Sequence, residues 1–182
     1  MKWAVAGAGG HGDRVIPADA FVHGEVKDEK PADKKELKNG TFLSDLEEEN
    51  VKMGFGKFGR NGDLTLENRR IKVNGVEYPK ALYMRPAHRG SASVTYDLDR
   101  DYSTFKTRVA VDDFSPGAAS PLTFKVFGDG QLLWSSEPVQ KPRRHQETTL
   151  DVKGVDKLEI RVEAKDSSQD GHAVWLDPQV FK

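Results

Sequence analysis

From about Thr41 onward, the chain contains several short segments in which apolar and polar residues alternate with a period of two. In the segment 157–164, KLEIRVEA, aliphatic side chains occupy every second position and charged side chains fill the positions between them. Because successive side chains of a strand point to opposite faces of its sheet, this pattern predicts an antiparallel strand with one buried face and one solvated face. The segments 93–98, SVTYDL, and 122–127, LTFKVF, alternate in the same way.

Short turn sequences separate the predicted strands. Asn74-Gly75 lies between two β-rich runs, and Asp129-Gly130 follows the segment 122–127. Asn, Asp and Gly tolerate a positive φ, which a two-residue type I′ turn needs, so each pair predicts a hairpin. Further strands are predicted at 51–58, 105–111 and 148–152.

No segment has a helical period that lasts three turns. The best candidate, DLEEENVK at 45–52, is short and acidic on every side. Several short strands with turn signals between them are typical of a sandwich or barrel. We therefore expect residues 41–182 to form one all-β sandwich of two packed sheets.

Residues 1–40 have a different composition. The glycine-rich AGAGGHG is followed by VKDEKPADKKELKNG, which is almost entirely charged. Such a segment buries too little apolar surface to offset the entropy of ordering, so it is predicted to be a flexible tail or linker. Gly7–Gly12 loosely follows a GxGxxG fingerprint, but no amphipathic helix follows, and a flexible loop is the favoured interpretation.

The overall composition narrows the range of partners. The 182 residues include 28 Lys and Arg against 29 Asp and Glu, so the formal net charge is -1. Nucleic-acid binding needs clustered positive charge, so we expect no nucleic-acid partner. The absence of cysteine excludes disulfides, thiolate catalysis and cysteine-ligated zinc. No run of about 18 apolar residues occurs, so we expect no membrane insertion, and no signal peptide is visible.

The histidines and carboxylates offer few catalytic arrangements. None of the five histidines pairs at i, i+4 or in an HxH arrangement, so their spacing supports no histidine-ligated metal. Asp112 and Asp113 follow the predicted strand 105–111, and adjacent strand residues point to opposite faces, which argues against an acid/base dyad. They are either turn-forming residues or part of a loop-built calcium or sugar site. No serine or cysteine nucleophile is indicated, so we expect no enzymatic activity.

Several side chains are of the types that a sugar site requires. Sugars present apolar C–H faces and many hydroxyl groups, so their sites combine an aromatic platform with hydrogen-bonding side chains. Core packing is the competing interpretation for each aromatic residue. The candidate carbohydrate-binding residues are Tyr83, Arg85, His88, His172 and Trp175.

Five stretches of the chain carry a resemblance to a known family. They are FLSDLEEENVKMGFGKFGRNG (42–62), IKVNGVEYPKAL (71–82), SVTYDLDRDYSTFKTRVAVDD (93–113), LTFKVFGDGQLLWSS (122–136) and DVKGVDKLEIRVEAKDSSQDGHAVWLDPQV (151–180). In this order they resemble the NPCBM domain, a family of carbohydrate-binding modules. That family is related to carbohydrate-binding module family 51 and occurs at the N-terminus of some family 98 glycoside hydrolases.

The resemblance implies a galactose-binding-like jelly-roll β-sandwich, often with a structural calcium ion. It also implies a non-catalytic module that tethers an associated enzyme or surface protein to glycans, which contain galactose for some members. Asp112 and Asp113 match the strand-end acidic motif of the family, and with Asp177 they are the predicted metal ligands. The segment 172–177 matches the C-terminal His-Ala-x-Trp-x-Asp pattern of the family.

One segment departs from the family pattern. Where the family usually has a glycine-rich stretch that ends in histidine and alanine, this chain has ALYMRPA at 81–87, and Arg85 stands at the place of the expected histidine. If that histidine contributes to the sugar site, the specificity is altered or sugar binding is lost. Tyr83 then offers a new platform.

We expect this chain to be a monomeric module of a larger protein, secreted or displayed at the cell surface, with a glycan or polysaccharide as its partner. The alternative is a sandwich module for protein interaction or structure that has lost sugar binding, which the departure at Arg85 motivates. A hydrolase would need two carboxylates about 5–10 Å apart, and the sequence offers no obvious pair.

Overall fold

The computed structural model describes residues 40–115, 120–140 and 145–182, and this part of the chain is all β apart from one short 3-10 helix, η2. The elements are β1 (Thr41–Phe42), η2 (Leu43–Asp45), β2 (Glu48–Lys52), β3 (Lys72–Val73), β4 (Val76–Glu77), β5 (Leu82–Met84), β6 (Ser91–Asp97), β7 (Thr104–Val111), β8 (Leu122–Gly128), β9 (Gln131–Ser135), β10 (Gln146–Asp151), β11 (Lys157–Ala164) and β12 (Ala173–Phe181). No helix in these residues is long and apolar enough to cross a membrane. The predicted tail and its glycine motif lie outside the described residues apart from Gly40, so the division of the chain at residue 41 stays a prediction.

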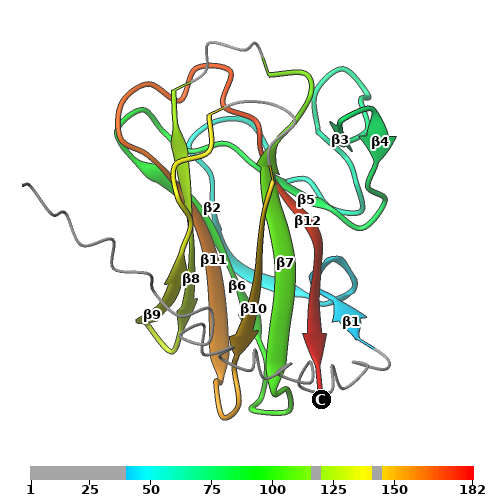
Figure 1. Ribbon diagram of the computed structural model, residues 1–182, viewed down its shortest axis with the longest axis vertical. Helices are drawn as coiled ribbons and strands as arrows, with labels where there is room; N and C mark the ends of the chain where they lie inside the picture. Colours follow the sequence, from blue (N-terminus) through cyan, green and yellow to red (C-terminus); the bar gives the residue numbers. More distant parts are fainter. Residues whose placement is uncertain (1–39, 116–119, 141–144) are drawn as a thin grey trace, which may run out of the picture. The chain divides into compact units, whose positions relative to one another are not determined.

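The strands form two antiparallel sheets of five strands and one separate hairpin (Figure 1). The first sheet has the order β1-β12-β7-β10, and β5 also pairs with β12. The second sheet has the order β2-β6-β11-β8-β9, and β3 and β4 form the hairpin. The prediction of an all-β sandwich is confirmed.

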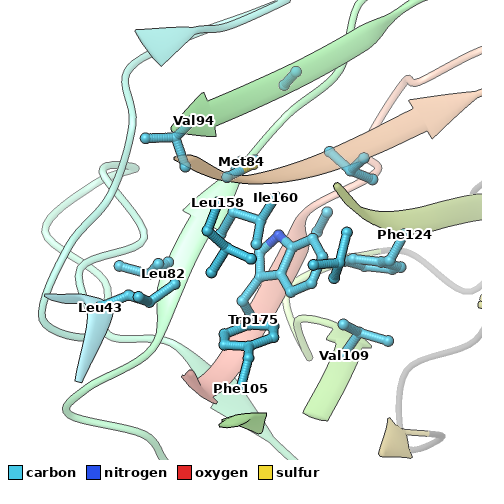
Figure 2. Close-up of a cluster of buried hydrophobic side chains, with 14 of the residues drawn as sticks. Leu43, Leu82, Met84, Val94, Phe105, Val109, Phe124, Leu158, Ile160 and Trp175 are labelled. Carbon is cyan, nitrogen blue, oxygen red and sulfur yellow. The ribbon is translucent and has the colours of Figure 1, made fainter. Parts of the chain in front are cut away.

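The main core lies between the two sheets. In β11, Leu158, Ile160 and Val162 are fully buried, as the alternation predicts. Figure 2 shows the indole ring of Trp175 (β12) among apolar side chains of this core, which include Phe105 (β7).

The first sheet carries a smaller apolar cluster on its other face. In β12, Val174 belongs to this cluster, whereas its neighbours Ala173 and Trp175 belong to the main core. Residues between β2 and β5 supply most of the remaining members, which are Leu64, Ile71, Val73 and Ala81. The long connection from β2 to β5 therefore covers the outer face of the first sheet, and the β3–β4 hairpin is part of that cover.

Both predicted hairpins form. Asn74 and Gly75 have φ of 54° and 75° between β3 and β4, and Asp129 and Gly130 have φ of 50° and 81° between β8 and β9. Two successive positive φ values are the signature of a type I′ turn, so these predictions are confirmed.

The strand predicted at 51–58 has the wrong bounds, because β2 ends at Lys52. A Cβ atom on Gly54 would lie 1.8 Å from the backbone nitrogen of Ala87, so a glycine is needed where the chain passes the end of β5. The backbone amides of Gly54 and Phe55 both donate to the Arg85 carbonyl, at 3.0 and 3.3 Å. The glycines thus mark a close backbone contact beside β5.

Candidate functional site

Three neighbouring strands of the first sheet end in one row of polar residues. Their last paired residues are Val111 of β7, Ala173 of β12 and Met84 of β5. The residues just beyond these strand ends are Asp112, His172 and Arg85, respectively. The Asp112 amide continues the pairing between β7 and β12 by donating to the His172 carbonyl at 2.9 Å. Because the last paired residues face the main core, their successors face the outer side of the sheet. With strands about 4.8 Å apart, the backbones of Asp112 and Arg85 are about 10 Å apart.

A pocket of about 440 Å³ opens at the Asp112 end of this row. Its walls come from the end of β7 and from the segment around the β3–β4 hairpin. The lining residues are Leu64, Asn68, Arg69, Arg70, Lys72, Glu77, Asp112, Asp113 and Phe114. Three cations, three carboxylates and one aromatic ring therefore surround one concave surface.

Phe114 is the exposed aromatic ring of this pocket, and 41% of its surface is accessible. The guanidinium carbon of Arg69 lies 4.2 Å from the centre of the ring. The ring of His172 stacks on Phe114 with 5.6 Å between centres and 30° between planes. These two contacts hold the Phe114 ring in place at the pocket, beyond the end of β7.

Asp112 and Asp113 attach the β3–β4 segment to the end of β7. The carboxylate of Asp112 accepts backbone amides of Lys72 and Phe114, both at 2.8 Å. The carboxylate of Asp113 accepts the backbone amides of Asn74 at 2.9 Å and Gly75 at 2.7 Å. Asp112 is buried, and burial raises the pKa of its carboxyl against the opposing effect of the two amides. Asp113 is exposed, and each of its carboxylate oxygens keeps a further lone pair with which it can accept a hydrogen bond from a hydroxyl group.

The three predicted metal ligands, Asp112, Asp113 and Asp177, do not lie together, so the prediction of one metal site that contains all three is corrected. Asp177 pairs with Arg108 at 3.0 Å, and it lies five residues along the chain from His172, or about 16 Å in an extended strand. Among the described residues, one group of three carboxylates has oxygens within 4.8 Å of one another. It consists of Asp97, Asp99 and Asp156.

That acidic group lies where β6 ends and β11 begins, at the opposite end of the strands from the pocket. Its Asp97 carboxylate accepts hydrogen bonds from Lys157 at 2.8 Å and from the Asp99 amide at 3.1 Å. These contacts satisfy Asp97 within the protein, so the geometry does not single out a cation site. Calcium binding stays a prediction from the family resemblance.

Tyr83 and His172 form a buried polar pair in the middle of the row. The Tyr83 hydroxyl lies 3.3 Å from Nδ1 of His172, and both side chains are almost inaccessible. Burial raises the pKa of Tyr83 to about 12. Burial, and then the charge of Arg85, lower the pKa of His172 to about 4. At neutral pH both groups are therefore uncharged. They lie beside the charged Arg85, and the His172 ring packs against Phe114.

Arg85 and His88 meet on a second aromatic ring beside β5. The guanidinium carbon of Arg85 lies 5.2 Å from the centre of the Phe55 ring, and the His88 ring contacts Phe55 edge-on at 5.0 Å. Phe55 is 39% exposed. His88 is exposed, and its Nδ1 accepts the Ser168 amide at 2.9 Å. This exposed group occupies the other end of the row from the pocket.

The structure therefore brings together four of the five predicted sugar-site residues and places Trp175 elsewhere. Trp175 is fully buried and packs edge-on against Phe124 with 5.2 Å between ring centres. A buried ring cannot stack on a bound sugar, so the predictions of Trp175 as a sugar contact and of Tyr83 as a new platform are both corrected.

Sequence reasoning missed Phe55, Phe114 and Arg69. The available signal was the local sequence around the two rings, since Phe55 lies between glycines and Phe114 precedes the sequence Ser-Pro-Gly. Phe114 lacks the alternating apolar neighbours of a core position, whereas Phe55 follows Val51 and Met53 in the segment predicted as a strand.

A β-sandwich with a polar pocket and an exposed aromatic ring at its strand ends is an architecture that occurs among carbohydrate-binding modules. The NPCBM/NEW2 domain family matches residues 39–181, and the chain belongs to this family. The resemblance stated from the sequence is thereby confirmed.

Solved structures of the CBM51 type share the fold. A CBM51 from Clostridium perfringens GH95, in complex with methyl-galactose, matches with a TM-score of 0.68 and 23% identity over 78% of this chain and 99% of that chain. The M60 catalytic domain with the CBM51-1 and CBM51-2 domains of Clostridium perfringens ZmpB matches with a TM-score of 0.69 and 25% identity, over 80% of this chain and 15% of that chain.

A curated relative is much longer than this chain. It is a Renibacterium salmoninarum protein named "Putative endo-alpha-N-acetylgalactosaminidase", which is 31% identical over 107 residues. The match covers 59% of this chain and 7% of that protein.

Proposed function

We propose that this domain binds glycans without cleaving them, and that the sugar sits in the pocket beside Phe114. The exposed Phe114 ring, next to carboxylates and guanidinium groups in one concave surface, is the observation that carries this proposal. A pyranose offers an apolar face to such a ring and hydroxyl groups to the surrounding donors and acceptors.

A galactose-containing glycan is the proposed ligand class. The CBM51 structure that contains methyl-galactose supports it, because that module is matched over nearly its whole length. The pocket residues also suit a sugar with neighbouring hydroxyl groups. Asp113 presents two carboxylate oxygens, and Arg69 and Arg70 line the same surface as donors. Affinities between micromolar and millimolar, about -8 to -4 kcal/mol, are expected for such a shallow contact.

A non-catalytic role within a larger secreted or surface protein is proposed as well. Asp112 and Asp113 are adjacent in the chain, and both are held by backbone amides rather than facing each other across a gap. That arrangement differs from the paired carboxylates of glycosidases, which stand about 5–10 Å apart on either side of the scissile bond. The length of the Renibacterium protein supports the idea that such a domain accompanies others.

Phe114→Ala is the direct test of the proposed site. We expect the dissociation constant for methyl β-galactoside or lactose, measured by calorimetric titration, to rise about tenfold or more, because the apolar platform is lost. The melting temperature should change little, since Phe114 is 41% exposed.

Leu132→Ala is the matched control for that variant. Leu132 is 50% exposed on β9 of the second sheet, so its loss removes comparable apolar surface away from the pocket. Sugar binding should be unchanged. Equal affinity of the Phe114→Ala variant and the unmodified protein would contradict the proposed site. A lack of binding to every glycan of a broad array would favour a module for protein interaction instead.

A further inference from the structure

Arg85 is a cation without a matching anion among the described residues. No carboxylate in this part of the chain forms an ion pair with Arg85, and its buried Nε has no hydrogen-bond partner there. An arginine has five N–H donors, and a buried donor without an acceptor costs free energy. Its guanidinium carbon lies over the Phe55 ring, at 5.2 Å from the centre.

The surroundings of Arg85 hold the guanidinium in place and leave it positive. Phe55 supplies a ring face at 5.2 Å, and the main chain of residues 54 and 55 is bonded to the Arg85 carbonyl. Its charge also acts on its neighbours. It adds to the effect of burial in lowering the pKa of His172, and it opposes the burial that raises the pKa of Tyr83. A positive group that is already oriented is the arrangement that favours binding of a carboxylate or sulfate.

His88 adds a second donor beside Arg85. Since Nδ1 of His88 accepts the Ser168 amide at 2.9 Å, the proton of its neutral ring is on Nε2. The ring is exposed and contacts the same Phe55 side chain. Arg85 and His88 therefore both present N–H groups near one exposed aromatic ring.

Arg85 lies on the same row of strand-end residues as the pocket. Arg85 stands in the same row as Asp112, on the same outer face of the first sheet, two strands away. Two strand spacings amount to about 10 Å, which is roughly the distance from one sugar ring to a group on the next. The backbone positions at the two ends of the row are therefore separated by a distance that a ligand of two sugar residues can span.

From these observations we infer that Arg85, with His88 and Phe55, forms an anion subsite, so that the preferred glycan carries a carboxylate or sulfate on the sugar next to the one in the pocket. The inference rests on the proposed function, because the pocket must hold the first sugar.

The test is a calorimetric comparison of lactose, 3′-sialyllactose and 3′-sulfated lactose. In 3′-sialyllactose the carboxylate is on the residue next to the galactose, whereas in 3′-sulfated lactose the sulfate is on the galactose itself, which serves as the control for distance. We expect 3′-sialyllactose to bind about tenfold more tightly than lactose, as a charge-assisted bidentate contact predicts, and 3′-sulfated lactose to gain less. The difference should shrink as sodium chloride rises from about 0.05 to 0.5 M, because salt screens exposed charges.

Variants separate this inference from the proposed function. In Arg85→Gln the ratio of the 3′-sialyllactose affinity to the lactose affinity should fall to about one. Arg85→Lys keeps the charge but lacks the planar guanidinium, so it should retain part of the preference. Lys165→Gln removes an exposed positive charge from the β11–β12 loop and should leave the preference intact. Equal binding of lactose and 3′-sialyllactose by the unmodified protein would overturn the anion subsite alone. Failure of all three to bind would overturn the proposed function together with it.

Discussion

Trp175→Ala is expected to cost about 3–5 kcal/mol of the free energy of unfolding, enough to unfold much of a domain of ordinary stability. The side chain is fully buried between the sheets, where it contacts Phe124 and lies near Phe105 (Figure 2). Its removal leaves a large cavity that the strands cannot close without breaking their pairing. Urea denaturation followed by circular dichroism measures the effect.

Trp175→Phe is the matched variant, because a smaller ring fills part of the same space. It should be destabilised less than Trp175→Ala and should bind sugar with unchanged affinity once folded. A stable, fully folded Trp175→Ala variant that has lost only sugar binding would contradict the packing role and restore a ligand-binding role for this residue.

Lowering the pH from 7 to 4 is expected to destabilise the domain by about 3 kcal/mol through His172 alone. The pKa of this histidine falls from 6.5 to about 4 on folding, and each tenfold loss of proton affinity corresponds to about 1.4 kcal/mol. As the pH falls through 6.5, the unfolded chain takes up a proton that the folded domain does not bind, so stability decreases until about pH 4 and then levels off. Chemical denaturation at a series of pH values gives the curve.

His172→Gln isolates this contribution. The variant has no titrating group at this position, so its free energy of unfolding should vary less between pH 7 and 4 than that of the unmodified protein. Asp112 acts with the opposite sign, because burial raises its pKa and its protonation relieves the buried charge. Since Asp112 is present in both proteins, the difference between the two curves still reports His172. Parallel curves would show that His172 is not buried as a neutral ring.

The sequence predicts the sheets well because strand burial here is mostly one-sided. The alternation in β11 identifies its buried residues directly, and Asn74-Gly75 and Asp129-Gly130 identify two hairpins from local backbone chemistry. The start of β2 was harder to predict, since its five residues are mostly exposed and Asn50 has a positive φ. Local composition there resembles a loop, and pairing with β6 makes it a strand.

The site was predicted only in part, because its geometry depends on contacts between distant residues. Trp175 gave no alternation signal, since the cover on the outer face buries its neighbours Val174 and Leu176 as well. The link from Asp113 to Gly75 joins residues 38 apart, which no local pattern reveals. Arg85 and His172, in contrast, were found from residue type and family pattern, and strand register brings them side by side.

The most direct measurement of the central claim is a titration of isotopically labelled protein with methyl β-galactoside, followed by backbone amide chemical shifts. The proposed site predicts saturable shifts at Lys72, Gly75 and Phe114, whose amides donate to the carboxylates of Asp112 and Asp113. Shifts that are absent, or that are confined to the opposite end of the sandwich around Asp97 and Asp156, would contradict it.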